Sequence, residues 1–574
     1  MDIEGNSLGK AEKVLNIDDA QLLAMGKKPE LQRVYNTWTC NDLGQLVMPY
    51  CPVFNYLRCW RPSKLNMGNL INILSVVVSI GQTLLMTSLA EYCSIWPTAG
   101  GQQYYTQALA TGKLRPFLSY LVGWAIMVGE ISTGSSCALN SAQIIASFVQ
   151  IAHPNVEWKY LSPILTTRKV MDDLVALQRA SHWSSHYKFK SEAIINGIRW
   201  LPGVNLFGAV WVVGGGVAWA IVFIAMAPKH DAEFIFTEFF NNTGYSKNGW
   251  VFVMSFYNSM YGMVGTDGLM HLVGSTTQRI CMPEEALISR QVEEMKNPAR
   301  NAPRSMIYSM ILCGVMSWLA AVVMMWTAGD WNAYMTSPQP YMSWWIGVTG
   351  SQYGGGLFCA LVMIGINFFV IVGTNSAGSR IVWSMARDKA FPYSEYLAQV
   401  NSRLGIPLRA IGFVVVVDLI LGLIVLGSDL AFQSIISGGG LMLQVSYLVP
   451  VLIVLVRGRK ILPSRVHFDL GKWGYIINVL SVSWSLLICA VYLCPLYVPV
   501  TIPTIDYMNW SCLIVGATIL FPGAYWIFGA RFRYIKEQNS VMDDNVVVID
   551  GMAVGGMEAV RRNEGARNFD AEKS

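Results

Sequence analysis

The sequence predicts an all-α polytopic membrane protein, and two observations carry this prediction. Of its 574 residues, 53% are hydrophobic and only 13% are charged, whereas about one-quarter of a soluble globular domain is charged. Apolar windows of about 18 or more residues recur along the chain, and a helix of that length crosses the hydrocarbon core of a bilayer. We expect about ten clear spans. In chain order they lie at 70–90, 117–151, 202–227, 250–272, 305–327, 354–377, 411–426, 431–455, 476–493 and 512–528.

The first two spans differ in the polar residues that they contain. Residues 70–90 are apolar almost throughout and precede a turn-rich segment at 96–116. The helix at 117–151 is apolar except around Gly129 and Glu130, where we expect an interruption. An ionisable group inside a span is costly and marks a functional site by default, so Glu130 is a candidate for proton coupling. The alternative is a carboxyl group that is hydrogen-bonded to neighbouring Ser or Thr side chains.

The span at 250–272 is the one around which the chain is organised. Its middle carries three glycines, a threonine and an acid: Gly262, Gly265, Thr266, Asp267 and Gly268. Unwound backbone at membrane depth is tolerated only where protein or a polar cavity satisfies it. We therefore predict a discontinuous helix whose break, with Tyr261, forms a substrate site; an inert kinked span is the alternative. Asp267 would bind a substrate amine or stabilise the break, or would act only as a helix cap.

The later spans are separated by loops that alternate in their content of basic residues. Arg531, Arg533 and Lys536 follow the last span, whereas the loop at 494–510 contains no Lys or Arg. Basic loops face the cytosol, so both termini are expected there. Residues 1–34 are polar and lack a signal-peptide core, which agrees with a cytosolic tail.

Composition excludes several other classes of protein. The net charge is +5 and no Lys/Arg run is long enough to suggest nucleic-acid binding. The eleven cysteines are scattered without a CxxC or Cys/His cluster, so neither a disulfide framework nor a metal site is expected. No constellation of His, Asp, Glu and Cys at catalytic spacing is present, so we expect neither an enzyme nor a cofactor.

Five segments, in this order, resemble the fungal amino-acid/choline permeases, which include GABA and choline permeases, of the amino acid–polyamine–organocation superfamily. They are WPTAGGQQYYTQAL (96–109), GTDGLMHLV (265–273), EEMKNPARNAPR (293–304), SRIVWSMARDKAFP (379–392) and IPLRA (406–410). The resemblance extends from about residue 70 to 535.

The resemblance implies a LeuT-like inverted-repeat fold of twelve helices, in which unwound helices 1 and 6 bind the substrate together. The span at 250–272 corresponds to helix 6. By the same resemblance, the segment at 96–109 corresponds to a cytosolic gating loop that contains Gly100 and Gly101. Arg387 and Asp388 correspond to charged residues of the gate. Residues 437–440 (SGGG) fall in helix 10, where we expect them to allow close helix approach rather than ligand contact.

The substrate class stays open between amino acids and quaternary amines. Free backbone N–H groups at a half-helix N-terminus suit the carboxylate of GABA or another amino acid. Choline has no carboxylate, and its ammonium group would need aromatic faces or an acid. Phe256, Tyr257 and Tyr261 could supply such faces.

Three segments depart from the family pattern. Removal of 273–291 restores the continuous segment HLVEEMKNP. Because Val codons begin with GT and a Gln codon can end with AG, we expect a translated intron there; a real cytosolic insert is the alternative. Residues 35–67 and 158–196 are too polar for helices 1 and 4, which also points to an erroneous gene model, the alternative being a diverged transporter.

These observations divide the chain and predict its function. We expect a cytosolic tail at 1–34, the departed helix-1 region at 35–67, a permease domain at 68–530 with the two aberrant inserts, and a cytosolic tail at 531–574. The expected function is proton-driven secondary transport of amino acids or related small amines, of the GABA or choline class, by alternating access. The plasma membrane is the expected location and the vacuolar membrane the alternative. A non-transporting nutrient receptor and an inactive product of a faulty gene model are the competing interpretations.

Overall fold

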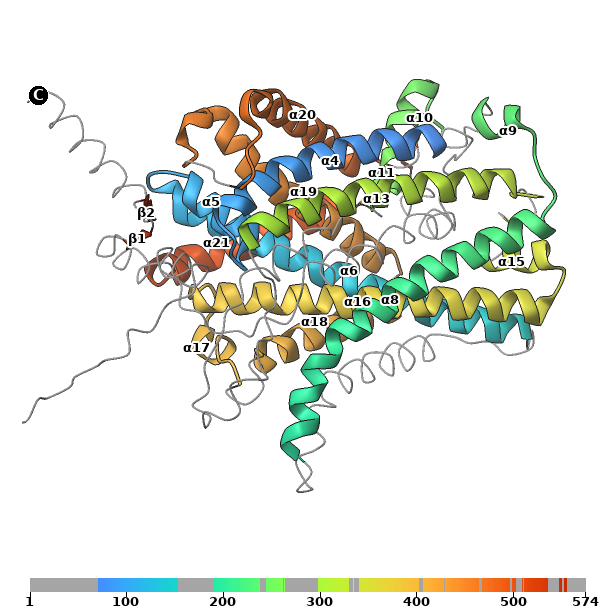
Figure 1. Ribbon diagram of the computed structural model, residues 1–574, viewed down its shortest axis with the longest axis horizontal. Coiled ribbons are helices and arrows are strands. Elements are labelled where there is room, and N and C mark those ends of the chain that lie inside the picture. The colour runs from blue at the N-terminus through green and yellow to red at the C-terminus, as the bar shows by residue number, and fades with distance from the viewer. Residues whose placement is uncertain are drawn as a thin grey trace, which may run out of the picture.

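The structure is a computed structural model, and the part of the chain that it describes is a bundle of long helices (Figure 1). The described residues are 71–152, 190–237, 244–261, 263, 298–329, 334, 340–401, 406–427, 429–463, 467–495, 498–501, 508, 510–534, 547–549 and 552–554.

The described part of the chain is almost entirely helical. The α-helices are α4 (Ile71–Ile95), α5 (Gly101–Leu109), α6 (Leu114–Ala152), α8 (Lys190–Met226), α9 (Ala232–Thr237), α10 (Asn248–Met254), α11 (Phe256–Tyr261), α13 (Pro298–Trp326), α15 (Pro340–Thr349), α16 (Gln352–Arg387), α17 (Ser394–Leu397), α18 (Leu408–Gly427), α19 (Asp429–Arg457), α20 (Gly474–Leu493) and α21 (Ser511–Phe528). Short 3₁₀ helices lie at Arg459–Ile461, Gly471–Trp473 and Ala530–Phe532. Strands β1 (Val547–Ile549) and β2 (Met552–Val554) pair antiparallel.

Eight helices in the described part of the chain are long and apolar enough to cross a membrane: α4, α6, α8, α13, α16, α19, α20 and α21. A further expected span, 411–426, coincides with α18. Large apolar side chains such as Ile221 on α8 and Leu520 on α21 are 63% and 73% exposed. Helices that are apolar on their outer faces are stable in lipid, where every backbone group is paired within the helix. The architecture is that of a polytopic membrane protein.

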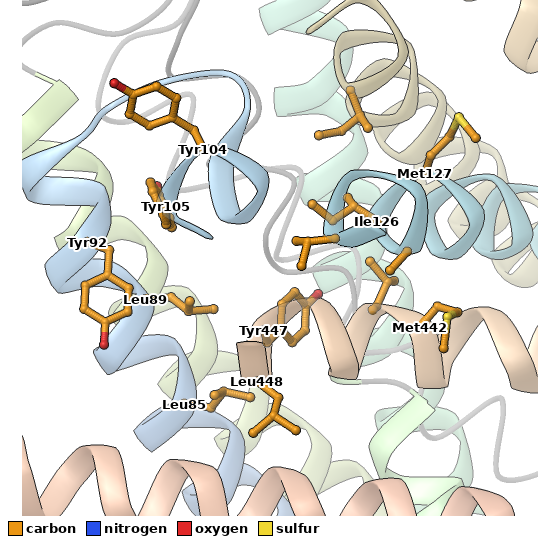
Figure 2. Close-up of a cluster of buried hydrophobic side chains, with 14 of the residues drawn as sticks. Leu85, Leu89, Tyr92, Tyr104, Tyr105, Ile126, Met127, Met442, Tyr447 and Leu448 are labelled. Carbon is orange, nitrogen blue, oxygen red and sulfur yellow. The ribbon is translucent and has the colours of Figure 1, made fainter. Parts of the chain in front are cut away.

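Buried side chains from several helices fill the space between α4, α5, α6 and α19. Figure 1 shows α13 running beside α4, and α16 running beside α6. In Figure 2, Leu85 and Leu89 of α4 face Tyr447 and Leu448 of α19, and all four side chains are buried. Because lipid tails are as apolar as leucine, helix association in a membrane depends on such close packing.

Helix α6 runs without a break through Gly129 and Glu130, so the predicted interruption there is wrong. Gly129 serves packing instead, because a Cβ at this position would lie 2.9 Å from the carbonyl oxygen of Gly439 on α19. A Cβ at Gly439 would in turn lie 2.5 Å from the Cβ of Ser132. The close helix approach predicted for residues 437–440 is therefore confirmed, and it joins α19 to α6.

The segments that depart from the family pattern lie mostly outside the described residues. This holds for 35–67, for 273–291 and for 158–189. The remaining residues of the expected insert, 190–196, belong to the first turns of α8.

Candidate functional site

The structure describes the first half of the predicted broken span, up to Tyr261, and also Met263. Helix α10 ends at Met254, α11 begins at Phe256, and α11 ends at Tyr261. Met263 follows in a turn in which its N–H donates to the carbonyl oxygen of Met260 at 2.9 Å. The predicted substrate residues after Tyr261 lie outside the described residues: Gly262, Gly265, Thr266, Asp267 and Gly268.

A buried amide network holds the backbone at this point. Gln82 on α4 donates through Nε2 to the carbonyl oxygen of Met263 at 3.5 Å and to Oε1 of Gln444 on α19 at 3.3 Å. Its Oε1 accepts from the indole N–H of Trp484 on α20 at 3.3 Å. Gln444 donates onward to Ser485 Oγ at 3.1 Å. Both glutamines are fully buried, and Gln82 thus links the backbone at Met263 to side chains of α19 and α20.

Gly81 makes this network possible. A Cβ at Gly81 would overlap the indole ring of Trp484, so only glycine lets the ring approach α4 closely enough to reach Gln82. The same indole lies against Phe256 of α11, with ring centroids 5.6 Å apart. Trp484 therefore joins α4 and α11, and the sequence reasoning missed both it and Gln82.

The other side of α11 contacts α19 and α20 through Tyr257. Its hydroxyl is hydrogen-bonded to Ser437 Oγ, and its ring lies 4.7 Å from that of Tyr492. Phe256 and Tyr257, which could supply aromatic faces to an ammonium group, are thus both packed against aromatic rings of α20. Ser437 contacts α11 as well as allowing the close approach predicted for its segment.

Glu130, the predicted proton-coupling residue, lies inside the bundle. It is 2% exposed on α6. A Cβ at Gly378 of α16 would lie 3.7 Å from the Cβ of Glu130, so α16 passes close to this carboxyl group. Glu130 therefore faces the interface between two long spans and not the lipid.

The predicted gating residues come together at one end of the bundle. Gly101 begins α5 with a φ of +48°, in the left-handed region that favours glycine. A Cβ at Gly100 would lie 3.4 Å from Ser384 Oγ of α16. Gln103 of α5 donates to Asp388 Oδ2 at 3.0 Å. The structure thus brings Gly100, Gly101 and Asp388 to the contact between α5 and the end of α16.

Arg387 is oriented differently from its neighbour Asp388. Its guanidinium carbon lies 4.5 Å from the ring centroid of Trp383, one turn earlier in α16. A guanidinium over a tryptophan face is attracted by the ring quadrupole. Arg387 thus contacts its own helix, whereas Asp388 contacts α5.

Tyr534 completes this cluster, and no sequence pattern indicated it. Its hydroxyl accepts from Gln103 Nε2 at 2.9 Å and is hydrogen-bonded to Ser119 Oγ at 2.9 Å. Its ring packs against Tyr120 and Trp526. Burial raises the pKa of the Tyr534 phenol, and the neighbouring carboxylate raises it further. The phenol is therefore neutral and keeps its proton for these hydrogen bonds.

Two further acids were missed as partners in cross-helix contacts. Glu91, at the end of α4, is fully buried and pairs with Arg459 at 2.6 Å. It also accepts from the N–H of Leu470 at 3.2 Å. Asp418, in the middle of α18, accepts from Ser135 Oγ of α6 at 2.5 Å. A signal for Asp418 was present, because it is an acid within an apolar run.

Known proteins resemble this chain over most of its length. An uncharacterized amino-acid permease of Schizosaccharomyces pombe is 25% identical over 92% of this chain and 91% of its own. Amino-acid permease 2 of Neurospora crassa is 24% identical over 90% of this chain and 88% of its own. A choline transporter of Saccharomyces cerevisiae is 24% identical over 81% and 76% respectively.

The match to a family covers the same region as the bundle. The family described as "Amino acid permease" matches residues 62–518, which include all the long helices of the bundle except the end of the last. The long apolar spans, with two of the five sequence segments packed together at one end, agree with that match. The chain belongs to the amino acid permease family, whose members are membrane transporters and not enzymes.

Proposed function

We propose that the protein is a secondary active transporter of amino acids or related small amines, of the GABA or choline class. The observation that supports this most directly is the buried amide of Gln82, which contacts the backbone at Met263, where the glycine-rich part of the span begins. A fixed backbone at a helix break can present free N–H groups to a substrate carboxylate. The relatives include both amino-acid permeases and a choline transporter.

The proposed substrate site comprises Tyr261, Gly262, Gly265, Thr266, Asp267 and Gly268. The backbone N–H groups of this segment would bind a carboxylate, and Asp267 would bind an amine. For choline, the ammonium group would instead need the aromatic rings of α11.

The proposed mechanism is alternating access on a LeuT-like fold of twelve helices with inverted repeats. A co-transported proton supplies the driving force, and Glu130 is the sequence-based candidate for its carrier. Gly100, Gly101, Arg387 and Asp388 act as the gate. The hydrogen bond from Gln103 to Asp388 supports a gate that closes where α5 meets α16.

The proposed location is the plasma membrane, with both termini in the cytosol. The basic loops support this orientation. We also propose that 273–291 is translated intron sequence, and that 35–67 and 158–196 replace helices 1 and 4. The chain as it stands would then transport less than a repaired one.

Uptake in cells that lack their own permeases tests this function. Cells would express the chain as it stands, the chain without 273–291, or the latter with helices 1 and 4 restored, and would receive radiolabelled GABA, choline or a panel of amino acids. Uptake that is saturable and abolished by Asp267→Asn is the expected result for an amine or amino-acid substrate. Saturable binding without uptake would favour a nutrient receptor. The absence of both from a repaired chain at the cell surface would refute the proposal.

A further inference from the structure

A carboxyl group lies buried between α18 and α6. Asp418 is 2% exposed and lies in the middle of α18. Its Oδ1 accepts the hydroxyl of Ser135 on α6 at 2.5 Å. Among the described residues, its Oδ2 has no hydrogen-bond partner although it is shielded from solvent. This oxygen can therefore be protonated without the loss of a hydrogen bond.

The surroundings of Asp418 contain no described cation that is paired with it. The helices packed against α18 are α6, α16, α17 and α19. The charged residues of these helices are Arg115 and Glu130 on α6, Arg380 and Arg387 on α16, Glu395 on α17, and Asp429 and Arg457 on α19. Within the described part of the chain, none of these forms an ion pair or hydrogen bond with Asp418.

An unpaired carboxylate that is buried between membrane helices has a high free-energy cost. Inside a membrane, an ionisable side chain needs a partner, a proton or water. Asp418 has one neutral donor and no paired cation, so the arrangement suits the neutral acid. A conformation that admits water to the carboxyl group would suit the ionised form. Protonation of Asp418 therefore favours one conformation over the other.

Polar side chains of α16 lie close to α6 near Ser135. Ser135 is next to Gly134, where a Cβ would lie 3.1 Å from both Thr374 Oγ1 and Asn375 Oδ1 of α16. The Asn375 oxygen is also buried, and it has no hydrogen-bond partner among the described residues. Thr374 and Asn375 of α16 thus place polar atoms against α6, one residue away from Ser135 in the chain. Water that enters this interface would find hydrogen-bond partners on the way to the carboxyl group.

We propose that Asp418 binds and releases the proton that drives transport. The inference rests on the proposed proton-coupled function. A proton from water on the outer side forms a bond to Oδ2 and makes the group neutral, which allows the dry packing against Ser135. The O–H bond breaks when water reaches the group from the inner side, and the proton leaves in that water.

Two transport modes separate a proton carrier from a structural residue. Full-length protein in liposomes would be tested with radiolabelled GABA or choline, whichever the uptake panel selects. Exchange of substrate across the membrane needs no net proton movement, whereas accumulation against a gradient does. A pH gradient of about one unit drives accumulation of up to about tenfold for one proton per substrate.

The variants are chosen to differ in one property each. Asp418→Asn keeps the shape and removes the titratable group, and Asp418→Ser is a second neutral form in case the first is not monodisperse. Ser135→Ala removes the hydrogen-bond donor but keeps the acid. Glu130→Gln tests the competing carrier.

Asp418→Asn is expected to reduce the accumulation ratio to about 1 while exchange stays within about twofold of the unmodified protein. Ser135→Ala, which keeps the acid, is expected to keep accumulation. The proposal is overturned where neutral variants at 418 still accumulate substrate, where they lose exchange and accumulation together, or where Glu130→Gln alone abolishes accumulation.

A second readout does not depend on transport. Infrared difference spectra of the purified full chain between low and high pH detect the C=O stretch of a protonated carboxylic acid. A titrating band that Asp418→Asn removes and Glu130→Gln retains is the expected result. If the chain takes up no substrate but gives this result, only the proposed function has failed. A spectrum that Asp418→Asn leaves unchanged refutes the proton site itself.

Discussion

Replacement of Gln82 by leucine tests whether the amide network fixes the backbone where the predicted break begins. Leucine has nearly the volume of glutamine, so packing changes little. The substitution leaves three buried polar groups without their partner: the carbonyl oxygen of Met263, Oε1 of Gln444 and the indole N–H of Trp484. Leaving such a group unsatisfied costs about 1–3 kcal/mol.

The hydrogen bonds in this network are long, at 3.3–3.5 Å, so each is taken at the lower end of that range. Gln444 and Trp484 lose their partner whether or not the backbone at Met263 has moved away, so only the lost bond to Met263 changes the balance between the two arrangements, by about 1 kcal/mol. That difference corresponds to a change of about fivefold in the equilibrium between the two arrangements.

Thiol labelling measures this equilibrium directly. Met263 is 1% exposed, so a cysteine in its place reacts only when the segment opens. Labelling of Met263→Cys should accelerate by up to about fivefold when Gln82→Leu is added. The same chain without the cysteine gives the background.

Thr87→Ala is the matched control on the same helix, because within the described part of the chain Thr87 bonds only to the carbonyl oxygen of Thr83 in α4. It should leave the labelling rate unchanged, because its hydroxyl makes no bond to Gln82 or Met263. Equal labelling rates with Gln82 and with leucine at this position would refute the argument. The network would then be a feature of packing without influence on the break.

Three further substitutions test the other contacts. Gly439→Ala should lower the stability of detergent-solubilised protein by about 1–3 kcal/mol, because α19 approaches α6 closely there. Gly516→Ala is the control, because a methyl group at Gly516 meets no neighbouring atom, and it should be neutral or slightly stabilising. Equal melting temperatures for the two variants would contradict this prediction. Glu91→Gln should lower the free energy of unfolding by about 1.5–3 kcal/mol, as measured by thermal unfolding. In a double-mutant cycle with Arg459, most of that value should appear as coupling energy between the two residues. Additive effects of the two substitutions would show that the ion pair contributes nothing. Because burial raises the pKa of Tyr534 in the folded protein, its contribution to stability is complete below pH about 10 and declines as the pH rises further, and Tyr534→Phe should lack this decline. Ultraviolet difference spectra between the two proteins that show phenolate forming at its ordinary pH would disprove the burial argument.

The spans were predictable because hydropathy records what the membrane requires of a helix. Long apolar windows predicted α4, α13, α20 and α21, and most of the predicted helix ends lie within a few residues of the observed ones. The continuity of α6 was not predictable, since Gly129 suggests a break in isolation and becomes a packing residue only when Gly439 is placed beside it. Glycine allows both outcomes, and the partner helix decides between them.

The contacts of the candidate site depend on helices that are far apart in the chain. Gln82 and Trp484 are separated by about 400 residues, and neither stands out within its own span. Their meeting requires α4, α11 and α20 to be in place. Asp418 did carry a local signal, as an acid within an apolar run, but its importance depends on what surrounds it. The substrate residues from Gly262 to Gly268 remain predictions from the sequence.

The position of Tyr534 determines how the C-terminus of this protein can be handled. A tag, a reporter or a truncation is usually placed just beyond the last membrane helix, which here ends at Phe528. Six residues later, the Tyr534 hydroxyl still contacts Gln103 of α5, the residue that also binds Asp388. A chain cut between Phe528 and Tyr534 would keep every described span but would lose the tyrosine side chain that contacts the proposed gate. Fusion and deletion experiments should therefore begin after Tyr534, or transport measured with them would report the missing side chain.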